Sequence, residues 1–388
     1  MPERLPLFAT ASKGTEPLLA DELKELGAQR IRQDRGGVRF MANHLEALKV
    51  LFHTRIAMRL LWPLLEGEAR GAQGLYDAVR EVPWEDHLDV STTFAVEATL
   101  KDSEHKHSGF VALKVKDAIV DRMRDKLGAR PDVDSRHPVV RVMAHLNKQQ
   151  LSLSLDLAGD ALNRRGYRVE QTQAPLKETL AAAVLRAANY TGDEPLADPL
   201  CGSGTLVLEA AMLAIRRPPG MSRSFAVEKW PAWEETARER LGELRAEAKA
   251  LERPPPFMLL GRDREPEAIA ASKANAKAAK LSQWVRFEEA DALTAPPPEG
   301  PPGLLVSNPP YGDRLTAGGQ KGMKTFYFKL SESLSKWAGW RMSFLCGNEA
   351  FESAFHRKPS ARRKLFNGPL ECQQYSYSAV ASQSPLGT

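Results

Sequence analysis

Hydrophobic and polar residues follow two different patterns along the chain, and the change comes near residue 170. Before it, short segments alternate apolar and polar positions, as half-buried strands do; they include residues 37–40, 93–98 and 151–156. Between them, apolar residues recur at helical spacing over residues 15–26 and 109–127, which predicts amphipathic helices. This mixture predicts an α+β fold for the first part of the chain.

After residue 170, short apolar runs alternate with longer helical segments. A helix is predicted over residues 175–190, and four later runs have the length and composition of buried strands. These candidate strands lie near residues 195–198, 257–261, 285–288 and 304–307. Strands that alternate with helices predict an open, mainly parallel α/β sheet. Because a chain of 388 residues is too long for one ordinary core, we expect separate domains.

Composition restricts the class of protein. Hydrophobic residues make up 43% of the chain and charged residues 27%, and we find no run of about 18 apolar residues that would span a membrane. The first residues lack the apolar segment of a secretory signal. The three cysteines, Cys201, Cys346 and Cys372, are too few and too scattered for a disulfide framework or a zinc site. We therefore expect a cytoplasmic protein that needs no metal.

Positive charge gathers in the first half and at the junction between the two parts. Lysine and arginine outnumber aspartate and glutamate by 54 to 49, for a formal charge of +5. The candidates for contact with a nucleic acid are Lys106, Lys114, Lys116, Arg164, Arg165 and Arg168. Such residues can neutralise phosphates, although a solvated charged face explains many similar runs. The charge pattern alone leaves both interpretations open.

Residues 308–311, Asn-Pro-Pro-Tyr, follow the last of the candidate parallel strands. The exocyclic amine of a nucleobase is a poor nucleophile because its lone pair is delocalised into the ring. The Asn308 side-chain oxygen and the Pro309 carbonyl could accept both amine hydrogens and favour a pyramidal nitrogen. Pro309 and Pro310 restrict the backbone, and Tyr311 could stack on a flat base. The sequence predicts a site of amine methylation, with a simple proline-rich turn as the alternative.

Three other strand ends carry groups suited to a nucleotide-like cofactor. Asp198 precedes a Cys-Gly-Ser-Gly turn at residues 201–204, where glycines let a backbone approach a ligand at a helix N-terminus. Asp263 could accept the hydroxyls of a ribose or cap its own helix. Asp291, followed by Ala292, could accept a hydrogen bond from an adenine amine. Each position alone has a structural explanation, but four suitable strand ends in succession favour a binding site.

Together these motifs resemble those of Rossmann-type S-adenosylmethionine methyltransferases that act on exocyclic base amines. The matching segments are residues 198–205, 261–263, 291–292 and 307–315. Upstream, the chain resembles the THUMP-domain guanine-N2 methyltransferases of bacterial large-subunit ribosomal RNA over residues 113–121, 164–168 and 174–180. Two residues depart from the family pattern, Arg262 before the ribose acid and Asp313 where glutamate is expected. Neither departure removes a chemical role.

The resemblance implies a domain organisation. A ferredoxin-like segment would occupy residues 1–60 and a THUMP RNA-binding domain residues 61–165. A Rossmann-like class I methyltransferase domain would follow over residues 166–388, with a helical insertion at about 216–256. We expect this insertion to be either a solvated helix anchored by aromatic residues or an RNA-facing lid.

The resemblance also implies roles for the site residues. The residues that would hold S-adenosylmethionine are Asp198, Cys201, Gly202, Ser203, Gly204, Asp263, Asp291, Ala292 and Asn308. The residues that would act on the substrate are Asn308, Pro309, Pro310 and Tyr311. The implied reaction methylates guanine N2 in 23S ribosomal RNA, on an unpaired or flipped base, and releases S-adenosylhomocysteine. The implied enzyme is a monomer.

Three alternatives stay open at this point. The substrate could be a guanine of tRNA, because THUMP domains also occur in tRNA methyltransferases. It could be the N6 amine of adenine in DNA, because the same tetrapeptide serves adenine chemistry. The chain could instead be a non-catalytic RNA-binding assembly factor, although its intact cofactor motifs argue against that.

Overall fold

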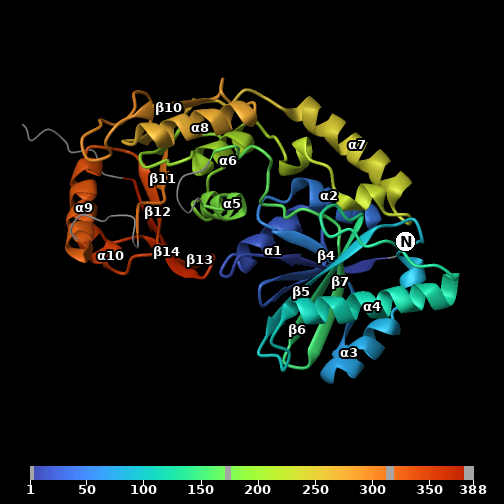
Figure 1. The fold of residues 1–388 in the computed structure, drawn as a ribbon. Coiled ribbons are helices and arrows are strands. Elements are labelled where there is room, and N and C mark those ends of the chain that lie inside the picture. The colour runs from blue at the N-terminus through green and yellow to red at the C-terminus, as the bar shows by residue number, and fades with distance from the viewer. Residues whose placement is uncertain (1–3, 171–175, 312–318, 380–388) are drawn as a thin grey trace, which may run out of the picture. The chain divides into compact units, whose positions relative to one another are not determined.

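The computed structural model describes residues 4–170, 176–311 and 319–379 (Figure 1). The chain forms two compact units. The first contains residues 1–11, 20–162 and 223–246, and the second contains residues 12–19, 163–222 and 247–388. Six positions that contribute to the family resemblance, residues 174–175 and 312–315, lie outside the described residues; they include Asp313.

The first unit is built on a mixed sheet of strand order β2-β3-β1-β4-β7-β6-β5, in which β5 and β6 are parallel and the other neighbours antiparallel. Its strands are β1 (Leu5–Thr10), β2 (Gln29–Asp34), β3 (Gly37–Ala42), β4 (Arg59–Glu68), β5 (Phe94–Lys101), β6 (Val140–Asn147) and β7 (Gln150–Asp156). Its helices are α2 (His44–His53), α3 (Gly71–Arg80), η1 (Trp84–Asp86), α4 (Ser108–Leu127) and η3 (Ala226–Lys229). Helices α1 (Glu16–Glu25) and α7 (Glu234–Leu251) have residues in both units. The α+β prediction is confirmed.

Helix α4 follows the predicted periodicity closely. Val111, Val115, Ile119 and Met123 are fully buried, so their common face lies against the sheet while the lysines between them point away from the core. Gly128 ends the helix in the left-handed conformation, at φ 74°, which a glycine adopts without steric cost. Helices α3 and α4 pack against each other, and α4 also packs on β5.

The second unit has the alternating α/β organisation predicted from the sequence. Its sheet has the order β10-β9-β8-β11-β12-β14-β13, parallel except for β14, which runs antiparallel to both neighbours. Its strands are β8 (Leu196–Asp198), β9 (Leu259–Asp263), β10 (Val285–Glu289), β11 (Leu304–Ser307), β12 (Arg341–Cys346), β13 (Ala361–Asn367) and β14 (Leu370–Tyr377). Its helices are α5 (Glu178–Ala187), α6 (Thr205–Ala214), η2 (Pro219–Ser222), α8 (Pro266–Ala278), α9 (Gly319–Leu334) and α10 (Ala350–Phe355).

The order of the second sheet reverses between β8 and β11. Successive strands run outward from β8 through β9 to β10, and the chain then returns to pair β11 with the other side of β8. In open α/β sheets, ligands bind outside the carboxyl ends of the strands at such a switch point. Asp198, Asp263 and Asn308 stand at these ends. The predicted Rossmann-like α/β fold is confirmed.

The predicted insertion at 216–256 contributes residues 223–246 to the first unit. Trp230 and Trp233 are buried there. The Trp230 indole donates to the Val139 carbonyl oxygen at 3.2 Å, and the Trp233 ring centroid lies 4.0 Å from that of His44. The insertion is therefore anchored by its aromatic residues, which is the first of the two expectations for this segment.

Long apolar helices are absent from the described residues. Within residues 4–170, 176–311 and 319–379, no helix is both long and apolar enough to cross a bilayer.

Candidate active site

The turn after β8 brings the backbone close to neighbouring side chains. Gly204 has φ 83°, and a Cβ there would lie 2.8 Å from Phe287 Cζ. Such an approach would force the ring to move, so glycine is required by packing as well as by backbone conformation. Cys201 is buried in the same turn, where burial raises the pKa of its thiol. Cys201 donates its N–H to the Arg262 carbonyl oxygen at 2.8 Å, which ties the turn to β9.

Arg168 forms hydrogen bonds with side chains of the glycine turn at residues 201–204 and of the residue after it. Its guanidinium donates to Ser203 Oγ at 3.3 Å and to Thr205 Oγ1 at 3.1 Å, on the two sides of Gly204, and to Glu178 Oε1 at 2.8 Å. The sequence predicts RNA contact through Arg168; its internal contacts show a structural role in the turn, and RNA contact stays a prediction. The guanidinium is already engaged by the residues that shape the glycine turn.

The structure contradicts the prediction that Arg165 contacts RNA. It is buried, with 2% of its side chain exposed, and its Nε lies 3.5 Å from Glu209 Oε1. Tyr167 Oη donates to the same carboxylate oxygen at 3.1 Å. A buried guanidinium paired in this way offers no surface to a phosphate. Of the three predicted junction arginines, only Arg164 is exposed.

Asn275, on α8, is a site residue that sequence reasoning missed. It is buried and donates from Nδ2 to the carbonyl oxygens of Ser203 and Glu170, at 3.1 and 2.9 Å. Its Oδ1 accepts from the N–H groups of Val169 and Glu170 at 2.9 and 3.0 Å. A single amide therefore joins the glycine turn to residues 169–170. An asparagine within a helix gives no local sign of such a role.

Asp198 is a buried carboxyl whose charge has no cationic partner among the described residues. Its Oδ1 accepts from Ser307 Oγ at 2.6 Å and from the Leu200 N–H at 3.1 Å. Burial, together with the nearby negative charge of Asp263, raises the pKa of Asp198 from 3.8 to about 7. A carboxyl in this state favours a cationic ligand, because a positive charge would stabilise its ionised form. Ser307 joins the ends of β8 and β11 and was not predicted as a site residue.

The other two predicted acids, Asp263 and Asp291, accept hydrogen bonds from backbone N–H groups. Asp263 accepts from the Gly202 N–H at 2.9 Å and from the Glu265 N–H at 3.1 Å, so it connects the glycine turn to the start of α8. Asp291 Oδ1 accepts from the Leu293 N–H at 2.9 Å. Ala292 is buried, and its carbonyl oxygen accepts from Ser333 Oγ at 2.8 Å. The structure brings both acids to the edge that carries Asp198.

The tetrapeptide 308–311 combines one unsatisfied acceptor with two anchored groups. Asn308 Oδ1 is buried and has no hydrogen-bond partner in the described structure. Tyr327 Oη donates to the Pro310 carbonyl oxygen at 2.7 Å, and Asn367 Nδ2 donates to Tyr311 Oη at 3.1 Å. Tyr311 is only 4% exposed, so its ring is packed inside the unit and not presented for the predicted stacking on a base.

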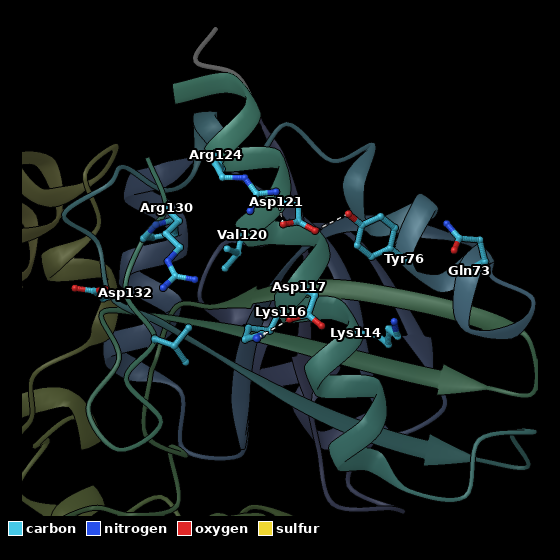
Figure 2. A pocket seen from close by; sticks show the side chains of 12 residues that line it. Gln73, Tyr76, Lys114, Lys116, Asp117, Val120, Asp121, Arg124, Arg130 and Asp132 are labelled. Carbon is cyan, nitrogen blue, oxygen red and sulfur yellow. Dashed lines mark hydrogen bonds and ion pairs between the residues drawn. The ribbon is translucent and has the colours of Figure 1, made fainter. Parts of the chain in front are cut away.

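The predicted RNA-contact lysines lie on the outer side of α4. Lys114 and Lys116 line a hollow of 550 Å³ between α3 and the loop after α4 (Figure 2). Lys116 pairs with Asp117 at 2.5 Å, whereas Lys114 and Arg130 make no ion pair with the described residues. Lys106, just before the helix, is exposed. The hollow therefore presents positive charge that is only partly neutralised.

A metal site is not found in the described part of the chain. No group of three or more His, Cys, Asp or Glu side chains there could hold a metal ion.

Comparison with known proteins identifies the family. Residues 6–61 match the RlmL ferredoxin-like domain, residues 69–156 the THUMP domain and residues 165–376 the methyltransferase domain described as RMKL-like. This chain belongs to the RMKL-like methyltransferase family. The THUMP-domain methyltransferase family predicted from the sequence is confirmed, and the three matched segments of this RMKL-like protein follow one another in the predicted order.

Individual relatives agree with this family assignment. Ribosomal RNA large subunit methyltransferase K/L of Syntrophotalea carbinolica is 41% identical over 98% of this chain and 55% of its own length. The candidate RNA methyltransferase slr0064 of Synechocystis sp. is 35% identical over 96% of each chain. The solved structure of SMU.472, a candidate methyltransferase in complex with S-adenosylhomocysteine, matches 99% of this chain and 100% of its own, with TM-score 0.88 and 29% identity. The chain spans about half the length of the K/L relatives that it matches.

Proposed function

We propose that this chain transfers a methyl group from S-adenosylmethionine to the exocyclic N2 amine of a guanine in 23S ribosomal RNA. One observation carries the proposal: Asn308 Oδ1 is buried and has no donor among the described residues. A buried polar atom without a partner costs about 1–3 kcal/mol. Such an atom is explained when a ligand supplies the missing hydrogen bond, and an amine of the substrate is a donor of the right kind.

The position of Asn308 supports this role. Asn308 directly follows Ser307, whose hydroxyl is bonded to Asp198 at 2.6 Å. The unsatisfied acceptor and the uncompensated carboxyl therefore lie at the ends of adjacent strands, β11 and β8. The Asn308 oxygen suits a neutral amine and the Asp198 carboxyl suits a cation. The two strand ends therefore fit a substrate and a charged cofactor that lie side by side.

The residues present fit S-adenosylmethionine. Asp198 would hold the ammonium of its methionine part, because that carboxyl is buried and has no cationic partner within residues 4–170, 176–311 and 319–379. Asp263 would accept from the ribose and Asp291 from the adenine, and the backbone of residues 201–204 would line the methionine part. When bound, this cofactor supplies an electrophilic methyl group. The S-adenosylhomocysteine in SMU.472 supports the same cofactor here.

In the proposed mechanism, the chain acts mainly by orientation. Asn308 Oδ1 and the Pro309 carbonyl oxygen accept the two hydrogens of guanine N2, so that its lone pair is directed toward the methyl group. The methylated nitrogen is cationic and therefore acidic, so its proton can pass to water without a strong base. Because Tyr311 is buried, it contributes in this account through the shape of the turn.

The proposed substrate is a structured RNA bound by the first unit. The partly neutralised hollow on α4 supports phosphate contact through Lys114 and Lys116. Lys106, just before α4, and Arg164, at the junction, are exposed candidates outside the hollow. The base must be unpaired or flipped out to reach Asn308. The name of the K/L relatives supports 23S ribosomal RNA. We also propose domain boundaries at 1–60, 61–165 and 166–388, and a cytoplasmic monomer.

The proposal is tested by supplying labelled S-adenosylmethionine together with 23S ribosomal RNA, tRNA and DNA in separate reactions. We expect label in 23S ribosomal RNA and at least tenfold less in the other two. Preferential label in tRNA or DNA would establish the corresponding alternative. RNA binding without any transfer would indicate an assembly factor.

A further inference from the structure

The Pro310 carbonyl oxygen is fixed by a side chain far from it in sequence. Tyr327, on α9, is completely buried, and its Oη donates to this oxygen at 2.7 Å. Its ring packs edge-on against Phe351, with the centroids 4.9 Å apart. A phenol held by packing on its ring has little freedom to move its hydroxyl. The hydrogen bond is therefore made by a group whose position is set independently of the tetrapeptide.

The hydrogen bond from Tyr327 to the Pro310 carbonyl determines the direction of a second contact. Tyr327 Oη also lies 3.5 Å from Cys346 Sγ. A hydroxyl has one proton and a carbonyl oxygen can only accept. When Tyr327 donates to Pro310, the Cys346 thiol must be the donor in the second contact. The phenol thus accepts from Cys346 on β12 and donates its one proton to the turn.

Two further contacts hold the residue after Pro310. Asn367 Nδ2 donates to Tyr311 Oη at 3.1 Å, and a Cβ at Gly347 would lie 3.0 Å from Tyr311 Cδ2. Upstream, Ser307 is the last residue of β11 and is bonded to Asp198. The turn is therefore fixed at both ends, and the carbonyl of Pro310 is held from the side by the Tyr327 hydroxyl.

These contacts bear on the acceptors that face the substrate. Proline rings limit φ at residues 309 and 310, so the main freedom left in the turn is rotation of its peptide planes. The Tyr327 hydrogen bond fixes the peptide plane between Pro310 and Tyr311. Because the end of β11 is also fixed, this bond limits rotation of the peptide plane that carries the Pro309 carbonyl. Misplacement of a reacting group by about 1 Å can cost a hundredfold in rate. The acceptors therefore need this support to stay in place.

We propose that Tyr327 is a positioning residue for methyl transfer, which holds the tetrapeptide in the geometry that its amine acceptors require. This inference rests on the proposed function of Asn308. It predicts that loss of the Tyr327 hydroxyl slows the chemical step and leaves binding of cofactor and RNA intact.

The test compares Tyr327→Phe with Tyr377→Phe. Tyr377 is a matched control, because it is also buried in the second unit but its hydroxyl has no hydrogen-bond partner in the described structure. For both variants we would measure kcat, the KM for RNA and the S-adenosylhomocysteine affinity. Rates would be divided by the concentration of S-adenosylhomocysteine-binding sites, so that unfolded protein does not count as slow enzyme.

We expect kcat of Tyr327→Phe to fall by about 10- to 100-fold, with KM and S-adenosylhomocysteine affinity within twofold of wild type. Tyr377→Phe should keep wild-type kcat. Equal kcat in the two variants, or a loss in Tyr327→Phe that appears only in binding, would overturn the positioning role. Asn308→Ala in the same assay separates the two proposals. If Asn308→Ala is inactive while Tyr327→Phe behaves as wild type, only the positioning role fails; if Asn308→Ala keeps wild-type kcat, the proposed amine site itself fails.

Discussion

The carboxyl edge of the second sheet and the outer side of α4 both carry polar groups, but they hold them in opposite ways. At the edge, Asp198 is 2% exposed and bonded to Ser307, and Asn308 Oδ1 is buried. On α4, Lys114 and Lys116 are partly exposed on long side chains around an open hollow (Figure 2). Fixed, desolvated groups discriminate strongly between ligands. Exposed charges contribute small, additive and salt-dependent amounts.

The largest effect is expected at the edge, from Asn308→Ala. Removing one fixed hydrogen-bonding group from a desolvated active site typically lowers kcat by about 10²- to 10³-fold. We expect a loss of this size with nearly unchanged S-adenosylhomocysteine affinity, because the acceptor lies beside the cofactor site and serves the amine. Calorimetry on the same preparation would check this. A parallel loss of cofactor affinity would assign Asn308 to the cofactor and not to the substrate.

The second expected effect is a pH dependence of stability and of cofactor affinity that arises from Asp198. The pKa of Asp198 is raised from 3.8 to about 7 by burial, with Asp263 as the neighbouring charge. Between these values the folded protein binds more protons than the unfolded chain, so its free energy of unfolding should fall as pH rises from about 4 to 7. Cofactor binding favours the ionised carboxyl. Affinity for S-adenosylhomocysteine should therefore fall by about tenfold for each pH unit below 7 and level off above 7.

Asp198→Asn provides the control for this pH dependence. The variant lacks the titrating group, so its weaker cofactor affinity should not vary with pH between 5.5 and 8. Calorimetry in two buffers with different heats of ionisation would also detect the proton released by the wild type. A slope that persists in Asp198→Asn would show that another group titrates.

A smaller loss is expected from Arg168→Gln. Arg168 supports the glycine turn through Ser203 and Thr205, so its loss should weaken cofactor affinity by about tenfold, the effect of one charged hydrogen bond. Arg164→Gln is the matched control, because Arg164 is exposed on the same segment. In the absence of RNA it should bind S-adenosylhomocysteine as the wild type does. Equal cofactor affinity in the two variants would contradict the supporting role of Arg168.

The smallest effect at physiological salt is expected on α4. Lys114→Glu/Lys116→Glu should weaken RNA binding several-fold and lower the slope of log affinity against log salt by about 1 to 2. Lys273→Glu/Lys277→Glu on α8 changes the charge of the chain equally and serves as the control. Filter binding at several salt concentrations gives both quantities. An unchanged slope in the α4 variant would remove the hollow from the RNA-binding surface.

The same contrast explains what the sequence could predict. Strand ends and helix faces are marked by local patterns, so the Rossmann-like sheet, α4, and the placement of Asp198, Asp263 and Asn308 at one edge were predictable. Arg165 and Arg168 carry the same local signal as a surface arginine. Their partners include Glu209 and Ser203, more than 30 residues away in the chain, and only the fold shows that these contacts are internal.

Supporting residues were missed for the same reason. Tyr327 and Asn275 lie on helices whose sequences show nothing but helical spacing, and their partners lie on other elements. The anchoring of residues 223–246 on the first unit depends on His44 and Val139, which precede that segment by many residues. Long-range packing of this kind is fixed by the three-dimensional fold and leaves no periodic pattern.

The central claim is that Asn308 accepts the N2 amine of guanine. The most direct test is mass-spectrometric nucleoside analysis of 23S ribosomal RNA after incubation with the protein and S-adenosylmethionine carrying a deuterated methyl group. The account predicts labelled N2-methylguanosine from the wild type and its loss from Asn308→Ala. Label recovered as N6-methyladenosine, or equal N2-methylguanosine from both proteins, would contradict it.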